Sequence, residues 1–132
     1  MTPRRLRFAL FGNIYQTKKS AAIQKVLSSI ANYDAELYVD EEYYNFLTVS
    51  QRLDVNTTKV FRDDDFDADF AVSMGGDGTF LKTAASVGNK EIPILGVNMG
   101  RLGFLADISP TDIESTLAAL YRDDYYTESR VL

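Results

Sequence analysis

Neither cysteine nor histidine occurs among the 132 residues of this sequence. Their absence excludes disulfides, zinc-finger chemistry, thiol nucleophiles and any catalytic dyad that needs a histidine. Basic residues are in the minority, because 14 lysines and arginines face 19 acidic residues and leave a net charge of −5. With no basic stripe to offset that charge, we expect no nucleic-acid partner and no membrane-surface role. Any acid–base chemistry must use carboxylates, lysines or tyrosines.

Long apolar runs are also missing. No run is long enough to span a bilayer, and Met1–Arg5 is not followed by the apolar core of a signal peptide. We therefore expect a cytoplasmic protein. The length is that of about one domain, and a hydrophobic share of 45% is enough for a packed core.

Short apolar runs alternate with helix-forming stretches. Unbroken apolar segments predict strands at Phe8–Phe11, Leu37–Val39, Phe70–Met74 and Ile92–Val97. Apolar residues at helical spacing predict helices at Ser20–Asn32, Glu41–Leu53 and Thr79–Val87 and after Ser109. Asp54–Asp69 is the least structured stretch. This order predicts an α/β fold with an open, mostly parallel sheet and helices on both faces.

The most informative stretch is Gly75–Thr79, which joins a predicted strand to a predicted helix. Its glycines allow left-handed backbone angles and a close approach to a ligand, and the helix N-terminus attracts phosphate oxygens. Asp77 would repel phosphate, but it makes sense beside a hydroxyl that it orients or deprotonates. The structural alternative is that Asp77 only caps the helix. The stretch is neither a Rossmann fingerprint, because Leu81 replaces the third glycine, nor a Walker loop.

A second glycine-rich stretch, Asn98–Leu105, follows the next predicted strand. The carboxyl ends of two successive parallel strands would build one crevice, and the alternative is an ordinary loop. Phe104 is a candidate wall for a base or a nicotinamide ring. Lys82, one turn inside the preceding helix, would meet an anion there or else face solvent.

Three other groups have a functional and a structural interpretation. Lys18 and Lys19 could reach a phosphate, but exposed loop lysines usually bind nothing specific. The Tyr43–Tyr44 pair could stack on a base, although aromatics at helical spacing are more often core. Asp63–Asp65 could hold a cation, but it lacks the glycine and glutamate of a calcium loop, so a solvated acidic loop is favoured.

The two glycine-rich stretches, Gly75–Thr79 and Pro93–Asp107, together closely resemble the NAD kinases. The first alone is also similar to loops of diacylglycerol kinases, sphingosine kinases and 6-phosphofructokinases, and the second decides among them. The resemblance implies a Rossmann-like, phosphofructokinase-like amino-terminal domain over residues 1–122. Residues 123–132 would then be the truncated start of an otherwise absent β-rich second domain.

The resemblance also implies an activity. Members of the family transfer a phosphoryl group from ATP, or in some cases polyphosphate, to the 2′-hydroxyl of the adenosine ribose of NAD, yielding NADP. Asp77 would be the proton acceptor, Mg²⁺ or another divalent cation would arrive with ATP, and no metal ligand is assigned in this chain. The implied binding residues for NAD and ATP are Gly75, Gly76, Asp77, Gly78, Thr79, Leu81, Lys82, Asn98, Gly100 and Phe104. 

Full-length members tend to form homo-oligomers and carry an Asn-Glu pair in the second domain. This chain has no Asn-Glu dipeptide, so the fragment is expected to be inactive alone. Two alternatives remain open. One is a non-catalytic dinucleotide-binding module, which would not need Asp77. The other is a lipid kinase of the diacylglycerol kinase superfamily, which the Asn98–Phe104 stretch disfavours.

Overall fold

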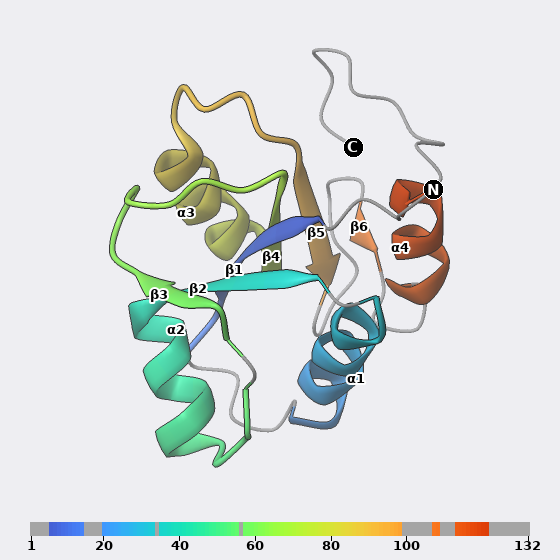
Figure 1. The fold of residues 1–132 in the computed structure, drawn as a ribbon. Coiled ribbons are helices and arrows are strands. Elements are labelled where there is room, and N and C mark those ends of the chain that lie inside the picture. The colour runs from blue at the N-terminus through green and yellow to red at the C-terminus, as the bar shows by residue number, and fades with distance from the viewer. Residues whose placement is uncertain are drawn as a thin grey trace.

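The computed structural model describes residues 6–14, 20–33, 35–55, 57–98, 107–108 and 113–121. Strands and helices alternate along most of this chain (Figure 1). In order, the elements are β1 (Arg7–Gly12), α1 (Ser20–Asn32), β2 (Glu36–Asp40), α2 (Glu41–Asn45), the π-helix η1 (Phe46–Ser50), β3 (Lys59–Phe61), β4 (Phe70–Gly75), α3 (Asp77–Val87), β5 (Ile94–Asn98), β6 (Asp107–Ile108) and α4 (Ile113–Tyr121).

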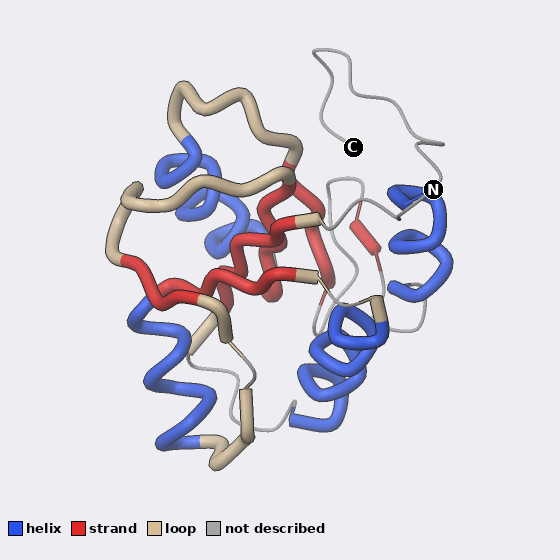
Figure 2. The backbone as a smooth tube through the Cα atoms, viewed as in Figure 1, coloured by secondary structure: helices blue, strands red, loops and turns tan. Residues whose placement is uncertain are grey.

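The strands form a single sheet in the order β3-β2-β1-β4-β5-β6, and every neighbouring pair is parallel. Figure 2 shows these strands side by side with the helices around them. From the central strand β1 the chain moves outward through β2 to β3. It then returns to the other side of β1 and continues outward through β4, β5 and β6. The predicted open parallel α/β fold is confirmed.

Successive side chains of the central strands enter two different cores. Phe8 and Leu10 of β1 pack in one cluster with residues of α1, α2, η1 and α4, whereas Ala9 and Phe11 pack in another with residues of α3. The Phe8 ring stacks on Phe70 of β4 with centroids 5.9 Å apart. Because strand side chains alternate between faces, these two cores lie on opposite sides of the sheet. Helices therefore cover both faces, as predicted.

Several boundaries differ from the prediction. The strand predicted at Ile92–Val97 begins at Ile94, and the helix predicted from Thr79 already begins at Asp77. The single helix expected over Glu41–Leu53 is instead a short α-helix that passes into the π-helical turn η1. The stretch Asp54–Asp69, predicted to be the least structured, contains the edge strand β3. Gly88 follows α3 as its C-cap with a positive φ of 54°, a conformation that glycine adopts readily.

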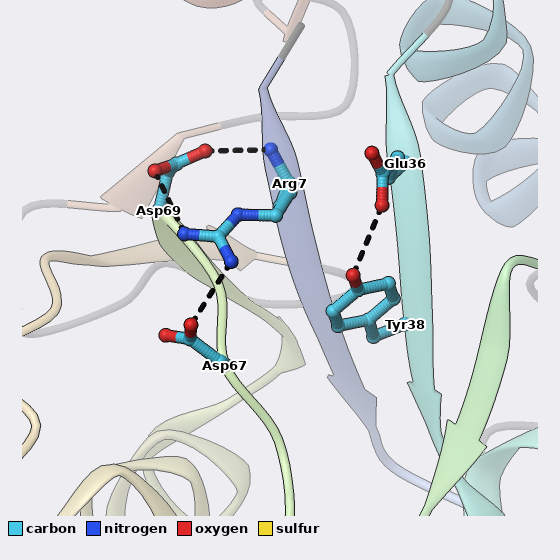
Figure 3. Close-up of polar contacts among 5 residues, drawn as sticks. All are labelled: Arg7, Glu36, Tyr38, Asp67 and Asp69. Carbon is cyan, nitrogen blue, oxygen red and sulfur yellow. Dashed lines mark hydrogen bonds and ion pairs between the residues drawn. The ribbon is translucent and has the colours of Figure 1, made fainter.

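The amino-terminal edge of the sheet is held by an ion-pair cluster (Figure 3). The Arg7 guanidinium contacts Asp67 at 3.0 Å and Asp69 at 3.5 Å, and the backbone N–H of Arg7 donates to Asp69 at 2.8 Å. These two carboxylates raise the pKa of Arg7. Asp67 and Asp69 therefore have a structural role at this edge. Asp63–Asp65 is exposed to solvent, in agreement with the favoured interpretation of a solvated acidic loop.

Candidate functional site

The carboxyl ends of β1 and β4 lie side by side where the strand order reverses. Gly12 is in register with Met74, and the backbone N–H of Asn13 donates to the Met74 carbonyl at 3.1 Å. After β1 the chain leads to α1 on one face, and after β4 it leads to α3 on the other. Ligands of open parallel sheets bind at such a reversal point, because the diverging loops leave a crevice.

A pocket of about 350 Å³ lies at this point. Its wall combines the end of β1, the first turn of α2 and the first turns of α3. The lining residues are Gly12, Asn13, Ile14, Glu42, Gly78, Thr79 and Lys82. Three segments that are far apart in the sequence therefore share one concave surface.

The start of α3 supplies bare backbone to this pocket. Gly76 occupies the N-cap position and has no side chain to accept from the first N–H groups of α3, while its carbonyl accepts from the Phe80 N–H at 3.0 Å. Uncapped N–H groups at a helix N-terminus carry partial positive charge and bind anions. The structural alternative made Asp77 the N-cap of this helix. Asp77 is instead the first helical residue, and Gly76 is the N-cap. The Asp77 side chain lies outside the described residues, and its catalytic role stays a prediction.

The glycines of this loop differ in what surrounds them. A Cβ atom on Gly75 would collide with the Thr79 side chain and would lie 3.2 Å from the Asn13 Cβ. On Gly76 or Gly78 it would meet nothing within 4 Å. Among the described glycines only Gly88 has a positive φ, so the expected left-handed geometry is not used in this loop. Gly75 allows close packing, whereas Gly76 and Gly78 leave space for a ligand.

Lys82 is anchored on the pocket wall by carboxylates of the neighbouring elements. Its Nζ donates to Glu42 Oε1 at 2.9 Å and lies 3.9 Å from Asp40 Oδ2. The hydrogen bond to Glu42 is the main cause of a raised pKa at Lys82. Lys82 is therefore not simply a solvent-facing lysine, since it links α3 to α2 beside the pocket.

Two buried residues, Asp40 and Tyr43, contact residues that line the pocket. Asp40 Oδ2 accepts the Tyr43 N–H at 3.2 Å and so caps α2, and burial raises the pKa of Asp40. The Tyr43 ring occupies the space where a Cβ on Gly12 would lie, and its hydroxyl donates to Met74 Sδ at 3.9 Å. Tyr43 is thus a core residue, as favoured. Tyr44 is half-buried and packs against the same core.

The structure brings only part of the predicted binding set to the pocket. Gly78, Thr79 and Lys82 line it, while Leu81 is 68% exposed and is not among its lining residues. The backbone of Asn98 ends β5 in register with Gly75. The Asn98 side chain and residues Gly100, Phe104, Lys18 and Lys19 lie outside the described residues.

Four of the lining residues, Gly12, Asn13, Ile14 and Glu42, were not predicted from the sequence. Gly12 and Asn13 directly follow the predicted strand Phe8–Phe11, and a glycine at the carboxyl end of a parallel strand is itself a signal for a site. Glu42 had no comparable signal. Its place in the pocket depends on the contact between α2 and α3, in which Glu42 and Lys82 are 40 positions apart in the sequence.

These features define an open parallel α/β domain of the Rossmann-like class, with a glycine-rich helix start facing a pocket where the strand order reverses. The family model described as "ATP-NAD kinase N-terminal domain" matches residues 8–125. The chain therefore belongs to the NAD kinase family. No helix within the described residues is long and apolar enough to cross a membrane.

Curated relatives agree with this assignment. The chain is 47% identical over 125 residues to an NAD kinase of Bacteroides fragilis, covering 95% of this chain and 43% of the relative. It is 34% identical over 128 residues to an NAD kinase of Porphyromonas gingivalis, covering 96% and 44%. The chain thus spans less than half the length of these relatives.

A solved structure supports the fold. The yeast NADH kinase complexed with NADH superimposes with a TM-score of 0.72 at 15% sequence identity, covering 94% of this chain and 40% of that chain. At this low identity the match supports the fold alone.

Proposed function

We propose that this chain is the amino-terminal domain of an NAD kinase, which transfers a phosphoryl group from ATP or polyphosphate to the 2′-hydroxyl of the adenosine ribose of NAD to give NADP. The observation that carries the proposal is the start of α3. It presents Gly76 and Gly78 with open space beside them, and it forms one wall of the pocket between β1 and β4. Membership of the family supplies the reaction.

Phosphoryl transfer requires mainly positioning and neutralisation of charge. The amides at the start of α3 and the Lys82 ammonium are suited to phosphate oxygens. A divalent cation enters with ATP as part of that substrate and neutralises charge on its phosphates. The residues that we assign to the binding of NAD and ATP are Gly75, Gly76, Asp77, Gly78, Thr79, Leu81, Lys82, Asn98, Gly100 and Phe104.

Asp77 is the proposed proton acceptor. The ribose 2′-hydroxyl oxygen forms a bond to the γ-phosphorus while the bond from that phosphorus to the ADP oxygen breaks. The hydroxyl proton passes to the Asp77 carboxylate. In this proposal backbone N–H groups at the start of α3 bind the nearby phosphates, and the Asp77 carboxylate acts on the sugar hydroxyl.

The proposal extends to the location, oligomeric state and domain division of the full-length protein. We infer a cytoplasmic enzyme of NADP biosynthesis that assembles as a homo-oligomer. Its α/β domain covers residues 1–122, and a β-rich domain begins near residue 123. The chain's coverage of 43% of an NAD kinase supports a missing second part.

The decisive experiment uses the full-length protein and the variant Asp77→Asn. Loss of a general base is expected to lower kcat by about 10²- to 10⁴-fold. The dissociation constant for NAD should change little, because the side chain keeps its size. Steady-state kinetics and calorimetric titration with NAD give the two quantities, and Asp64→Asn, at an exposed position, is the matched control.

Two results would contradict the proposal at different points. Equal losses of turnover and NAD affinity in Asp77→Asn would remove Asp77 from the role of proton acceptor. A wild-type protein that binds NAD but forms no NADP would instead be a non-catalytic dinucleotide-binding module.

A further inference from the structure

We propose that Glu42 is a positioning residue that holds the Lys82 ammonium on the pocket wall, where it can receive phosphate oxygens. This inference rests on the proposed function, because it concerns how the same pocket binds its anionic substrates. The phosphates can belong to the dinucleotide or to the nucleoside triphosphate. Both present the same chemistry to a lysine.

Two carboxylates lie close to the Lys82 ammonium and are in a position to compete for it. Glu42 Oε1 lies 2.9 Å from Nζ and belongs to the pocket lining, whereas Asp40 Oδ2 lies 3.9 Å away and Asp40 is not a lining residue. Asp40 is 8% exposed and is fixed in place as the cap of α2. The Lys82 side chain is 47% exposed, so its long stem has room to change conformation when one of these partners is lost.

The outcome of this competition decides where the ammonium points. An ammonium has three N–H donors, so a bond to Glu42 leaves others for a ligand. If Glu42 loses its charge, the flexible lysine stem is expected to turn toward Asp40 and away from the pocket. Glu42 therefore counteracts Asp40 and keeps the donor exposed to the ligand.

The helix α2 provides a matched control beside Glu42. Glu41 precedes it in the same turn and forms its own ion pair, accepting from Arg62 Nε at 2.9 Å. Successive helical residues point about 100° apart, and Glu41 is not among the lining residues. Both residues are glutamates in the same helical turn, and each forms its own salt bridge. They differ in that only Glu42 lines the pocket.

The experiment compares Glu42→Gln, Glu41→Gln and Asp40→Asn in the full-length protein. Dissociation constants are measured separately for NAD and for ATP, together with KM, kcat and the unfolding midpoint. We expect Glu42→Gln to raise the dissociation constant of at least one ligand by about threefold, the scale of a half-exposed ion pair, with kcat little changed. The ligand whose affinity falls identifies which phosphates Lys82 meets.

The other variants make the test specific. Glu41→Gln should leave both dissociation constants unchanged. Asp40→Asn keeps a side chain that caps helices and removes the competing charge, so affinity should rise rather than fall. In the background of Lys82→Met, Glu42→Gln should have no further effect.

Three results would overturn the proposal. Glu42→Gln could bind both ligands as well as or better than wild type, which would make Glu42 a competitor of the substrate. Asp40→Asn could weaken binding as Glu42→Gln does, or Glu41→Gln could do the same, which would indicate a general effect on helix packing. If the wild type makes no NADP while the affinities follow the expected pattern, the proposed function fails and the positioning role stands.

Discussion

The glycines beside the pocket serve two different physical purposes. Gly12 is packed directly against the buried ring of Tyr43, and a Cβ there would collide with it. Gly78 faces open space, and it lies in the first turn of α3. One glycine is therefore required by the fold, whereas the other is available to a ligand.

The variants Gly12→Ala and Gly78→Ala separate these purposes. Overpacking against Tyr43 should make Gly12→Ala less stable by about 1–3 kcal/mol. Gly78→Ala should be unchanged or more stable by up to about 1 kcal/mol, because alanine favours a helix. Its ligand affinity should fall, since the added methyl group would occupy the pocket. Urea unfolding and titration with NAD measure the two effects.

Equal destabilisation by the two substitutions would contradict this division. So would unchanged NAD affinity in Gly78→Ala, because the open space would then have no use in binding.

At the scale of elements, the junction of β2 and α2 positions the pocket. Asp40 ends the strand and caps the helix with no loop between them. Glu42 is consequently in the first turn of α2, two residues after the carboxyl end of β2. The helix then continues as the π-helical turn η1, whose Phe46 and Leu47 are buried. Such π-helical turns are rare and often lie near functional sites.

Asp40 makes this junction sensitive to pH. Burial raises its pKa above the ordinary value of 3.8, so the folded protein binds the proton more tightly than the unfolded chain does. Its contribution to stability is greatest below pH 3.8 and is lost as pH rises through the folded-state pKa. Asp40→Asn should therefore be at least as stable as wild type at pH 7, and this advantage should disappear in acid.

The capping role predicts the result for a third variant. Asp40→Ala should be less stable than Asp40→Asn by about 1 kcal/mol at pH 7, because alanine cannot cap α2. Urea unfolding from pH 3 to pH 8 measures both differences. A wild-type protein clearly more stable than Asp40→Asn at pH 7 would show that the ion pair with Lys82 outweighs the cost of burial.

At the scale of the molecule, we expect this chain to form one side of a larger site. Its pocket is built from β1, α2 and α3, while the relatives are more than twice as long as the matched region. By resemblance, the missing part carries the Asn-Glu pair and further contacts to the dinucleotide. The α/β domain by itself should then hold phosphates without orienting the ribose.

We expect the isolated 132-residue chain to form no measurable NADP from NAD and ATP, while the full-length protein does. An enzymatic assay coupled to an NADP-dependent dehydrogenase measures both under the same conditions. Circular dichroism of the isolated chain should show folded α/β structure, which is the necessary control. NADP formation by the isolated chain would show that the essential groups all lie within it.

Most of the sheet could be predicted because its central strands are buried on both faces. Phe8, Leu10, Ala9 and Phe11 are all at most 1% exposed, so the strand is a continuous apolar run in the sequence. The edge strand β3 was missed for the opposite reason. Lys59 is exposed and Phe61 is buried, and three residues are too few for a recognisable pattern.

The sequence by itself determined the open parallel α/β class and the place of the glycine-rich turn, because both follow from local patterns of apolar residues and glycines. Only the tertiary structure decided that Gly12 and Glu42 lie beside that turn, and that Asp40 and Glu42 both lie close to the Lys82 ammonium. These contacts depend on the order of the strands and on the direction of α2. No local pattern encodes either, because distant segments meet only after the sheet has formed.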